Sequence, residues 1–317
     1  MNLKIKIGTR ESELAVWQAT FVKTHLLKNG FDAELIYIKT EGDVDTVTPL
    51  YELGVQGIFT KTLDAALVSN KVDIAVHSMK DVPTLLAQGI QQAAVLKRAS
   101  YKDVLVYKNK SIITTWRLTD KLIDPILSMG TIATSSIRRR AQWLHRYPAH
   151  SIENLRGNIN TRLKKLEQNE WDGAIFAAAG LERINLRPKN AIDLDWMLPA
   201  PAQGAILIVC REDDSNAFKA CESLNNEDTA LCTKIERDFL RSLLGGCSTP
   251  ISALAEVKND SVFFKGNICS TDGKEIIEIQ KICAVKESRL LGVYAAEEIL
   301  KDKKAQNIMH SIRNEKK

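Results

Sequence analysis

Short apolar runs alternate with amphipathic helical patterns from residue 3 to about residue 211. Such alternation predicts βαβ units, in which the strands form a sheet and the helices cover it. After a first strand at residues 3–8, we expect strands at residues 33–40, 73–78, 91–97, 103–108, 131–133, 173–178 and 205–210. This part of the chain therefore predicts an α/β fold.

The pattern changes after residue 225. We expect a long helix at residues 229–244, strands at 252–257, 262–269 and 275–285, and a helix at 289–300. This order predicts a separate α+β domain. Two breaks in the earlier pattern, at residues 98–102 and 198–203, indicate that the chain crosses twice between neighbouring lobes.

The charge balance limits the classes of partner. The 44 Lys and Arg residues exceed the 39 Asp and Glu residues by a net charge of +5, which is compatible with acidic small molecules and is a weak signal for nucleic acid. No stretch has the length of a membrane span, and the first strand begins without a signal-peptide core. We therefore expect a cytoplasmic protein without membrane contact.

Cysteines and histidines are spread without a metal-ligand spacing. The 6 cysteines include no Cys-x-x-Cys, and the 5 histidines form no ligand pattern with them. We therefore expect no metal site and reduced thiols.

The segment VDIAVHSMKDVP, residues 72–83, ends an apolar strand in Ser78, Lys80 and Asp81. The carboxyl ends of strands in an open α/β sheet are where ligands bind. Because neighbouring residues of an extended segment point in opposite directions, we expect Lys80 and Asp81 to diverge. The alternative is a surface turn with two solvated charges.

Three further strand-to-helix turns carry arginines. The first has Arg10 followed by Ser12, the second has Ser135 and Ser136 before the arginines at 138–140, and the third has Arg156, Gly157 and Arg162. Because a helix amino terminus favours anions, basic residues there indicate that an anion is bound. Each arginine can bind a carboxylate through two parallel hydrogen bonds.

Near residue 245, a predicted helix ends in two glycines that precede Cys247. Glycines allow a tight loop that can present the next side chain. The alternative is an ordinary helix end followed by a buried cysteine.

Seven segments occur in the order found in the hydroxymethylbilane synthases, also called porphobilinogen deaminases, which the chain resembles from about residue 4 to residue 250. They are IGTRESELAVWQA, HSMKDVP, TSSIRRR, LRGNINTRL, AAAGLERI, PAPAQGA and ERDFLRSLLGGCSTP. The resemblance implies two α/β lobes of the periplasmic-binding-protein type flanking a cleft, plus a smaller α+β C-terminal domain. We expect lobe 1 at residues 1–98 and 202–219, lobe 2 at 99–201, and the third domain at 220–317.

The resemblance also implies an activity. Four porphobilinogen molecules are joined head to tail with loss of ammonia, giving linear hydroxymethylbilane, and a dipyrromethane cofactor held covalently by Cys247 primes the growing polypyrrole. Asp81 is the expected catalytic residue, because its carboxylate can stabilise positive charge on the deaminated substrate and move protons. The family is typically monomeric, so a monomer is expected.

The implied binding residues fall into two groups. Cofactor binding is expected of Cys247, Lys80, Ser78, Ser135, Ser136, Arg138, Arg139 and Gly157. Substrate binding is expected of Arg10, Ser12, Arg156, Arg162 and Arg183.

The chain departs from the family pattern in three places. Glu52 and Gln56 stand where bacterial relatives often carry lysines, in a segment at 41–57 that resembles the loop over the cleft. Ser100 and Tyr101 replace an Asp-Pro pair in the first crossing. In the second crossing, residues 201 and 202 are Pro and Ala where Val and Gly are common. These differences bear on loop closure and hinge stiffness.

Three other readings remain open from the residues. A two-lobed binding protein for anionic small molecules would explain the α/β pattern, but it gives Cys247 no role. A nucleic-acid binder would use the arginines at 138–140 as a phosphate patch. A Cys–His hydrolase would pair Cys247 with His77 or His145, but no third residue is in view to orient the histidine.

Overall fold

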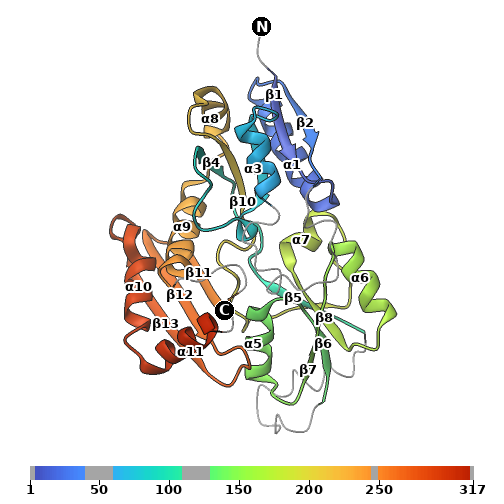
Figure 1. Cartoon of the computed structure of the whole chain (residues 1–317), viewed down its shortest axis with the longest axis vertical. Coiled ribbons are helices and arrows are strands. Elements are labelled where there is room, and N and C mark those ends of the chain that lie inside the picture. The colour runs from blue at the N-terminus through green and yellow to red at the C-terminus, as the bar shows by residue number, and fades with distance from the viewer. Residues whose placement is uncertain (1–3, 40–59, 109–128, 244–248, 315–317) are drawn as a thin grey trace.

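The structure, a computed structural model, describes residues 4–39, 60–108, 129–243 and 249–314. Its described strands form two five-stranded sheets and one three-stranded sheet. Figure 1 shows the first sheet and its helices at the top, the second at the lower right in green, and the C-terminal unit at the lower left in orange and red. Two α/β lobes and a smaller α+β domain confirm the predicted fold class.

The sheet of the first lobe has the strand order β2-β1-β3-β10-β4. Its strands are β1 (Ile5–Thr9), β2 (Ala33–Tyr37), β3 (Ile74–Ser78), β4 (Ile90–Val95) and β10 (Ile206–Arg211). The described helices of this lobe are α1 (Glu13–Lys28), α3 (Lys61–Val68) and α8 (Ser215–Glu222). The central strands are apolar on both faces because helices cover both, and Ile7, Ile74 and Leu207 are buried.

The second lobe repeats this topology with the order β7-β6-β8-β5-β9. Its strands are β5 (Asp103–Tyr107), β6 (Thr131–Ala133), β7 (Ser151–Glu153), β8 (Gly173–Ala177) and β9 (Ala191–Asp193). Its described helices are α5 (Ile137–Arg146), α6 (Ile159–Gln168) and α7 (Ala178–Arg183). In each lobe, the strand that the chain enters after a crossing, β10 or β5, runs antiparallel to both neighbours.

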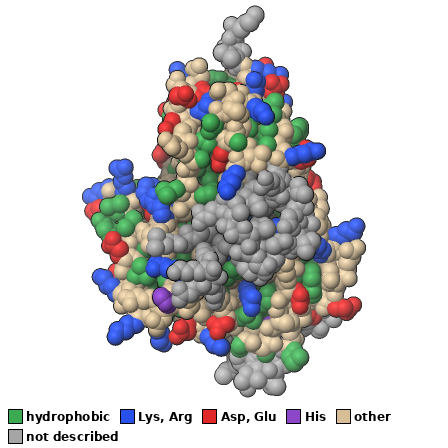
Figure 2. Space-filling model, viewed as in Figure 1, with side chains coloured by type: hydrophobic (Ala, Val, Ile, Leu, Met, Phe, Trp, Pro, Cys, Tyr) green, Lys and Arg blue, Asp and Glu red, His purple; other side chains and the backbone are tan. Residues whose placement is uncertain are grey.

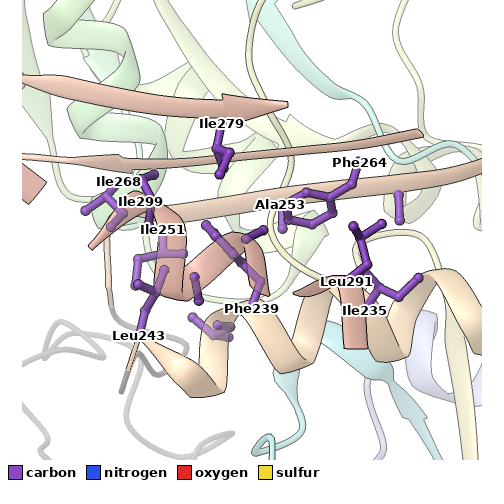
Figure 3. Close-up of a cluster of buried hydrophobic side chains, with 14 of the residues drawn as sticks. Ile235, Phe239, Leu243, Ile251, Ala253, Phe264, Ile268, Ile279, Leu291 and Ile299 are labelled. Atoms are coloured by element: carbon purple, nitrogen blue, oxygen red, sulfur yellow. The ribbon is translucent and has the colours of Figure 1, made fainter. Parts of the chain in front are cut away.

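The C-terminal domain packs helices on an antiparallel sheet of order β11-β12-β13. Its elements are α9 (Glu227–Ser242), β11 (Ile251–Lys258), β12 (Ser261–Cys269), β13 (Ile276–Ala284), the 3-10 segment η2 (Val285–Leu290), α10 (Leu291–Ile299) and α11 (Lys303–Asn314). Figure 3 shows Ile235 and Phe239 of α9 facing Phe264 of β12 and Leu291 of α10. The rings of Phe239 and Phe264 meet edge to face with centroids 5.2 Å apart.

The predicted elements lie close to the observed ones, and one predicted conformation is wrong. No strand was predicted at β7 or β9, which have three residues each, and no helix was predicted at α3, α7, α8 or α11. The segment Met79–Asp81 forms a 3-10 turn, η1, so the expectation of an extended segment there was wrong. Among the described residues, no helix is long and apolar enough to cross a membrane.

Candidate functional site

A cavity of about 430 Å³ lies between the two lobes. Its walls come from the turn between β1 and α1, from η1 after β3, from the start of α5, from the turn before α6, from α7 and from the residues just before β10. These are the strand-to-helix turns that the sequence singled out, because the carboxyl ends of parallel strands meet at one edge of each sheet. The predicted site residues on its wall are Arg10, Ser12, Ser78, Lys80, Asp81, Arg139, Arg156, Gly157, Arg162 and Arg183.

Basic side chains outnumber acidic ones on this wall. Six of its residues are Lys or Arg, and three are carboxylates, Glu11, Glu13 and Asp81. Asn160 of α6 donates a hydrogen bond to Glu13 of α1 at 2.7 Å, which joins the two lobes beside the cavity. The excess of cations in a partly enclosed space favours a ligand with several negative charges.

Lys80 is held at the junction of both lobes. Its ammonium donates to the side-chain oxygen of Gln203 at 3.2 Å. Burial lowers the pKa of Lys80 to about 8, although the carboxylate of Asp81 acts in the opposite direction. The charged form of Lys80 is therefore stabilised by any anion that enters the cavity.

Arg162 and Arg183 are cations in a similar state. Burial lowers the pKa of Arg162 to about 10, and the charge of Arg139 adds to this shift. Burial also lowers the pKa of Arg183 to about 10, against the effect of Glu182. Arg162 donates to the carbonyl of Gly157 at 2.7 Å, and Arg183 donates to the carbonyl of Gly204 at 2.7 Å. Both guanidinium groups stay charged at neutral pH, and a bound carboxylate would offset their desolvation.

Asp81 is exposed to solvent while it lines the cavity. It comes at the end of η1, which turns the chain immediately after β3. Lys80 and Asp81 therefore both line the cavity from a tight turn and not from an extended strand. A carboxylate at this place can accept a proton from, or stabilise positive charge on, a molecule in the cavity.

Three of the predicted serines have different surroundings: Ser78 lines the cavity, whereas Ser135 and Ser136 do not. Ser78 exchanges hydrogen bonds with the side chain of Gln18 of α1, at 3.0 and 3.3 Å. Ser136 is the N-cap of α5, where its hydroxyl accepts from the backbone N–H of Arg139. Ser135 donates to the side chain of Asn154 at 2.5 Å. Neither Ser135 nor Ser136 lies on the cavity wall.

Arg138 and Arg139 form ion pairs with a carboxylate of the chain itself, that of Asp103. Arg138 donates to one carboxylate oxygen of Asp103 at 2.7 Å, and Arg139 donates to the other at 2.7 and 3.0 Å. Burial would raise the pKa of Asp103, but the two guanidinium groups outweigh it and lower the pKa to about 2. Asp103 of β5 is therefore one anion at this helix terminus, supplied by the chain itself. Of the two arginines, Arg139 lines the cavity and Arg138 does not, and the expected role of Arg138 in cofactor binding stays a prediction.

Gly157 occupies a turn that requires glycine. Its φ is +109°, and a Cβ there would lie 2.7 Å from the Thr161 side chain. Any other residue would therefore be strained and would also clash. The turn directs Arg156 to the cavity and starts α6 at the N-cap Asn158.

Gln203 was missed as a functional residue by the sequence reading. It is fully buried in the second crossing. Its amide donates to the carbonyl of Tyr101 at 2.7 Å and to Asp103 at 2.9 Å, while its oxygen accepts from Lys80. The only signal was its place within PAPAQGA. Gln203 links the cation of one lobe to the buried ion cluster of the other.

Cys247 and the segment 41–57, with Glu52 and Gln56, lie outside the described residues. The described cysteines are free thiols, and burial raises the pKa of Cys210, for example, to about 11. Within the described ranges, no group of three or more His, Cys, Asp and Glu residues is placed to hold a metal ion.

Comparisons with known proteins agree with one another. Residues 5–219 match the family model of the porphobilinogen deaminase dipyromethane cofactor binding domain, and residues 230–301 match the porphobilinogen deaminase C-terminal domain. The chain is 39% identical over 321 residues to the porphobilinogen deaminase of Chlorobium phaeobacteroides, with 99% of each covered. It is 38% identical to that of Desulforamulus reducens, with 95% of each covered.

Among solved structures, a crystal structure of the methionine-binding protein MetQ is 16% identical, with a TM-score of 0.42, and covers 71% of this chain and 91% of that one. The family models together with the near-full-length relatives decide the assignment. The chain belongs to the porphobilinogen deaminase family.

Proposed function

We propose that this chain is a hydroxymethylbilane synthase, which condenses four porphobilinogen molecules head to tail with release of ammonia. The observation that carries the proposal is the cavity with six cationic side chains, built from the segments that the family models match. Each pyrrole unit of this substrate carries an acetate and a propionate. A growing product chain therefore gains two carboxylates with each addition, and it needs a cationic wall.

The cavity residues fit a dipyrromethane cofactor, whose two pyrroles carry four carboxylates. The fit rests on Lys80 and Arg139, which line the cavity. Lys80 has a lowered pKa because burial has removed water from its charge. When bound, this group supplies the pyrrole carbon to which the first substrate molecule is joined.

The proposed attachment point of the cofactor is the thiol of Cys247. Cationic surroundings favour the thiolate, which is the nucleophilic form of cysteine. Lys80 and Arg139 would bind carboxylates of the attached pyrroles, next to Ser78 and Gly157. Arg138, Ser135 and Ser136 would act through the fold, by fixing Arg139 and the turn that follows β6.

The proposed substrate residues take the carboxylates of the incoming porphobilinogen and of the extended chain. They are Arg10, Ser12, Arg156, Arg162 and Arg183. Two parallel hydrogen bonds from a guanidinium fix the orientation of a carboxylate. Correct orientation brings the pyrrole carbon and the departing aminomethyl group into line, which can supply a large share of the rate.

Asp81 is the proposed catalytic residue. As the aminomethyl nitrogen leaves, positive charge develops on the pyrrole, and the carboxylate of Asp81 stabilises that charge. The same oxygen can take the proton that is lost when the new carbon–carbon bond restores the aromatic ring. Its exposed position in the cavity supports both roles, because a mobile proton needs an exit to water.

Nucleic-acid binding is not favoured. Arg138 and Arg139, two of the three consecutive arginines, are buried and paired with Asp103. On the described part of the face shown in Figure 2, basic and acidic side chains are interspersed. A phosphate-binding surface would need a continuous area of exposed basic side chains without acidic ones among them.

The mass of the intact protein tests the proposal. We expect the purified chain to exceed its sequence mass by two pyrrole units, with the adduct mapping to the peptide that contains Cys247. A Cys247→Ala variant is expected to carry no adduct and to have no turnover. Fully active enzyme with an unmodified Cys247 would falsify this assignment, and an anionic-ligand binding protein would then be the better description.

Three expectations remain predictions. We propose that lobe 1 comprises residues 1–98 and 202–219, lobe 2 residues 99–201 and the third domain residues 220–317. We also propose that the enzyme works as a monomer in the cytoplasm. Analytical ultracentrifugation of the loaded enzyme measures the oligomeric state, and fractionation of cells measures the location.

A further inference from the structure

A second cavity of about 310 Å³ lies outside the cleft. Its wall is formed by α1, the residues after β4, the end of α7, the start of β10 and the residues after α8. Its lining includes Trp17, Phe21, His25, Lys97 and Arg183. The volume is at the lower end of the ~300–1,000 Å³ typical of small-molecule sites.

Three aromatic rings of α1 form one wall of this cavity. Trp17, Phe21 and His25 follow each other at a spacing of four residues, so they stand on one face of the helix. The rings of Trp17 and Phe21 stack at an interplanar angle of 15° with centroids 5.4 Å apart, and those of Phe21 and His25 are 4.2 Å apart. The Nδ1 atom of His25 lies 2.8 Å from the Phe21 carbonyl oxygen, which fixes the orientation of the imidazole.

This aromatic face borders the core face of α1, because Trp17 is partly buried and packs against the core cluster. Ala19, Val22 and Leu26 of the same helix are fully buried against the sheet. Phe21 is 38% exposed. A helix of a globular protein normally turns polar residues to the outside, so the exposed ring of Phe21, stacked beside the partly buried ring of Trp17, offers a flat apolar ligand a surface at the edge of the core.

Two cations complete the cavity. Lys97 is exposed, and the described residues give it no ion pair. The guanidinium carbon of Arg183 lies 5.8 Å from the centre of the Trp17 ring. Rings on one side and cations beside them are complementary to an aromatic carboxylate, which can stack through its ring and bind through its charge.

We propose that this second cavity binds a small planar aromatic carboxylate of one or two rings. The ring stacks on Phe21 and Trp17, and the carboxylate is bound by Lys97 and Arg183. Arg183 also lines the cleft, so a ligand here shares a residue with the polypyrrole site. This link rests on the substrate role proposed above for Arg183, whereas the binding itself does not.

Isothermal titration of the cofactor-loaded enzyme with indole-3-acetate tests the site without any turnover. We expect saturable binding. Two control ligands separate the contributions: indole-3-acetamide keeps the ring and loses the charge, and cyclohexylacetate keeps the charge and loses the aromatic plane. Each is expected to bind at least about tenfold more weakly, since a charge-assisted hydrogen bond and a ring stack are each worth about that factor.

Two variants locate the site. Lys97→Gln and Phe21→Ala are each expected to weaken indole-3-acetate binding about tenfold. The matched controls are Lys71→Gln, at another exposed lysine of the same lobe, and Leu27→Ala, at an exposed apolar residue of α1 that does not line the cavity. Both controls are expected to bind like the parent, and Lys97→Gln is expected to keep parental turnover with porphobilinogen.

Absence of saturable binding up to millimolar ligand would overturn the proposal. So would binding that Lys97→Gln and Phe21→Ala leave unchanged, because the ligand would then occupy the cleft or another surface. Neither result would bear on the catalytic proposal, which depends on the adduct at Cys247 and on turnover.

Discussion

Arg98 and Glu236 form a bidentate ion pair that joins the first crossing between the lobes to helix α9 of the C-terminal domain. The guanidinium donates to the two oxygens of Glu236 at 2.5 and 3.1 Å, and Glu236 is fully buried. The same carboxylate accepts the backbone N–H of Ala202 at 2.6 Å and that of Ala255 at 2.8 Å. One side chain thus connects both crossings to the C-terminal sheet.

Glu236→Gln is expected to lower the free energy of unfolding by ~3–5 kcal/mol, because it leaves the guanidinium of Arg98, whose side chain is only 11% exposed, without its counter-ion. Equilibrium unfolding in urea measures this loss. The control is Glu256→Gln, whose pair with Lys258 is solvent-exposed and is worth less than about 1 kcal/mol. If both variants lost equal stability, the ion pair with Arg98 would have no special structural role.

Asp81→Asn is expected to reduce turnover by about 10²–10⁴-fold, because the amide has no negative charge to offer the reacting pyrrole and is a poor proton acceptor. The fold and the cofactor adduct should survive, since Asp81 is exposed. Single-turnover release of ammonia by cofactor-loaded enzyme is the measurement, with the exposed Asp213→Asn as control. Release within a few-fold of the parent would leave Asp81 as a turn residue only.

Arginines of the ion cluster and arginines of the cleft should fail at different stages. Arg139→Lys and Arg138→Lys disturb the pairs with Asp103, so we expect incomplete cofactor assembly. Arg10→Lys and Arg162→Lys should assemble cofactor and then accumulate partly extended intermediates, because a lysine cannot bind a carboxylate bidentately. Native mass spectrometry before and after addition of substrate separates the two outcomes.

Four variants with normal assembly and normal turnover would contradict the carboxylate-binding assignment. The exposed Arg140→Lys provides the matched control, since its side chain projects from the first turn of α5 and does not line the cavity.

Lys80→Met should stabilise the cofactor-free protein near neutral pH while abolishing cofactor retention. The pKa of Lys80 falls from 10.5 to about 8 in the fold, chiefly through burial. Between these two pH values the unfolded chain binds more protons than the folded one, so the stability that depends on Lys80 rises with pH and reaches its full value above about 10.5.

Thermal unfolding of cofactor-free protein as a function of pH measures this effect. The rise between about pH 8 and 10.5 should become smaller in Lys80→Met and should persist in Lys71→Met, at an exposed lysine. An unchanged rise in Lys80→Met would mean that Lys80 is not the desolvated group.

Local patterns in the sequence determined the elements and the edge of each sheet where chemistry occurs. Strand periodicity placed β3, β5, β6 and β8, and the residues after β1 and β3 reached the cavity as expected. The strands could be predicted because the buried positions of a strand follow one another along the sequence. The edge could be predicted because βαβ units bring the carboxyl ends of their strands to a common edge.

Only the tertiary structure decided which charged side chains form ion pairs with each other. Arg138 and Asp103 are 35 residues apart, and Arg98 and Glu236 are 138 apart, so no local period relates them. Nothing in the local sequence around Asp103 indicates that its carboxylate pairs with Arg138 and Arg139. Whether a cation faces a protein carboxylate or an empty cavity depends on topology and burial, because the energy of a buried charge is determined by all the groups around it.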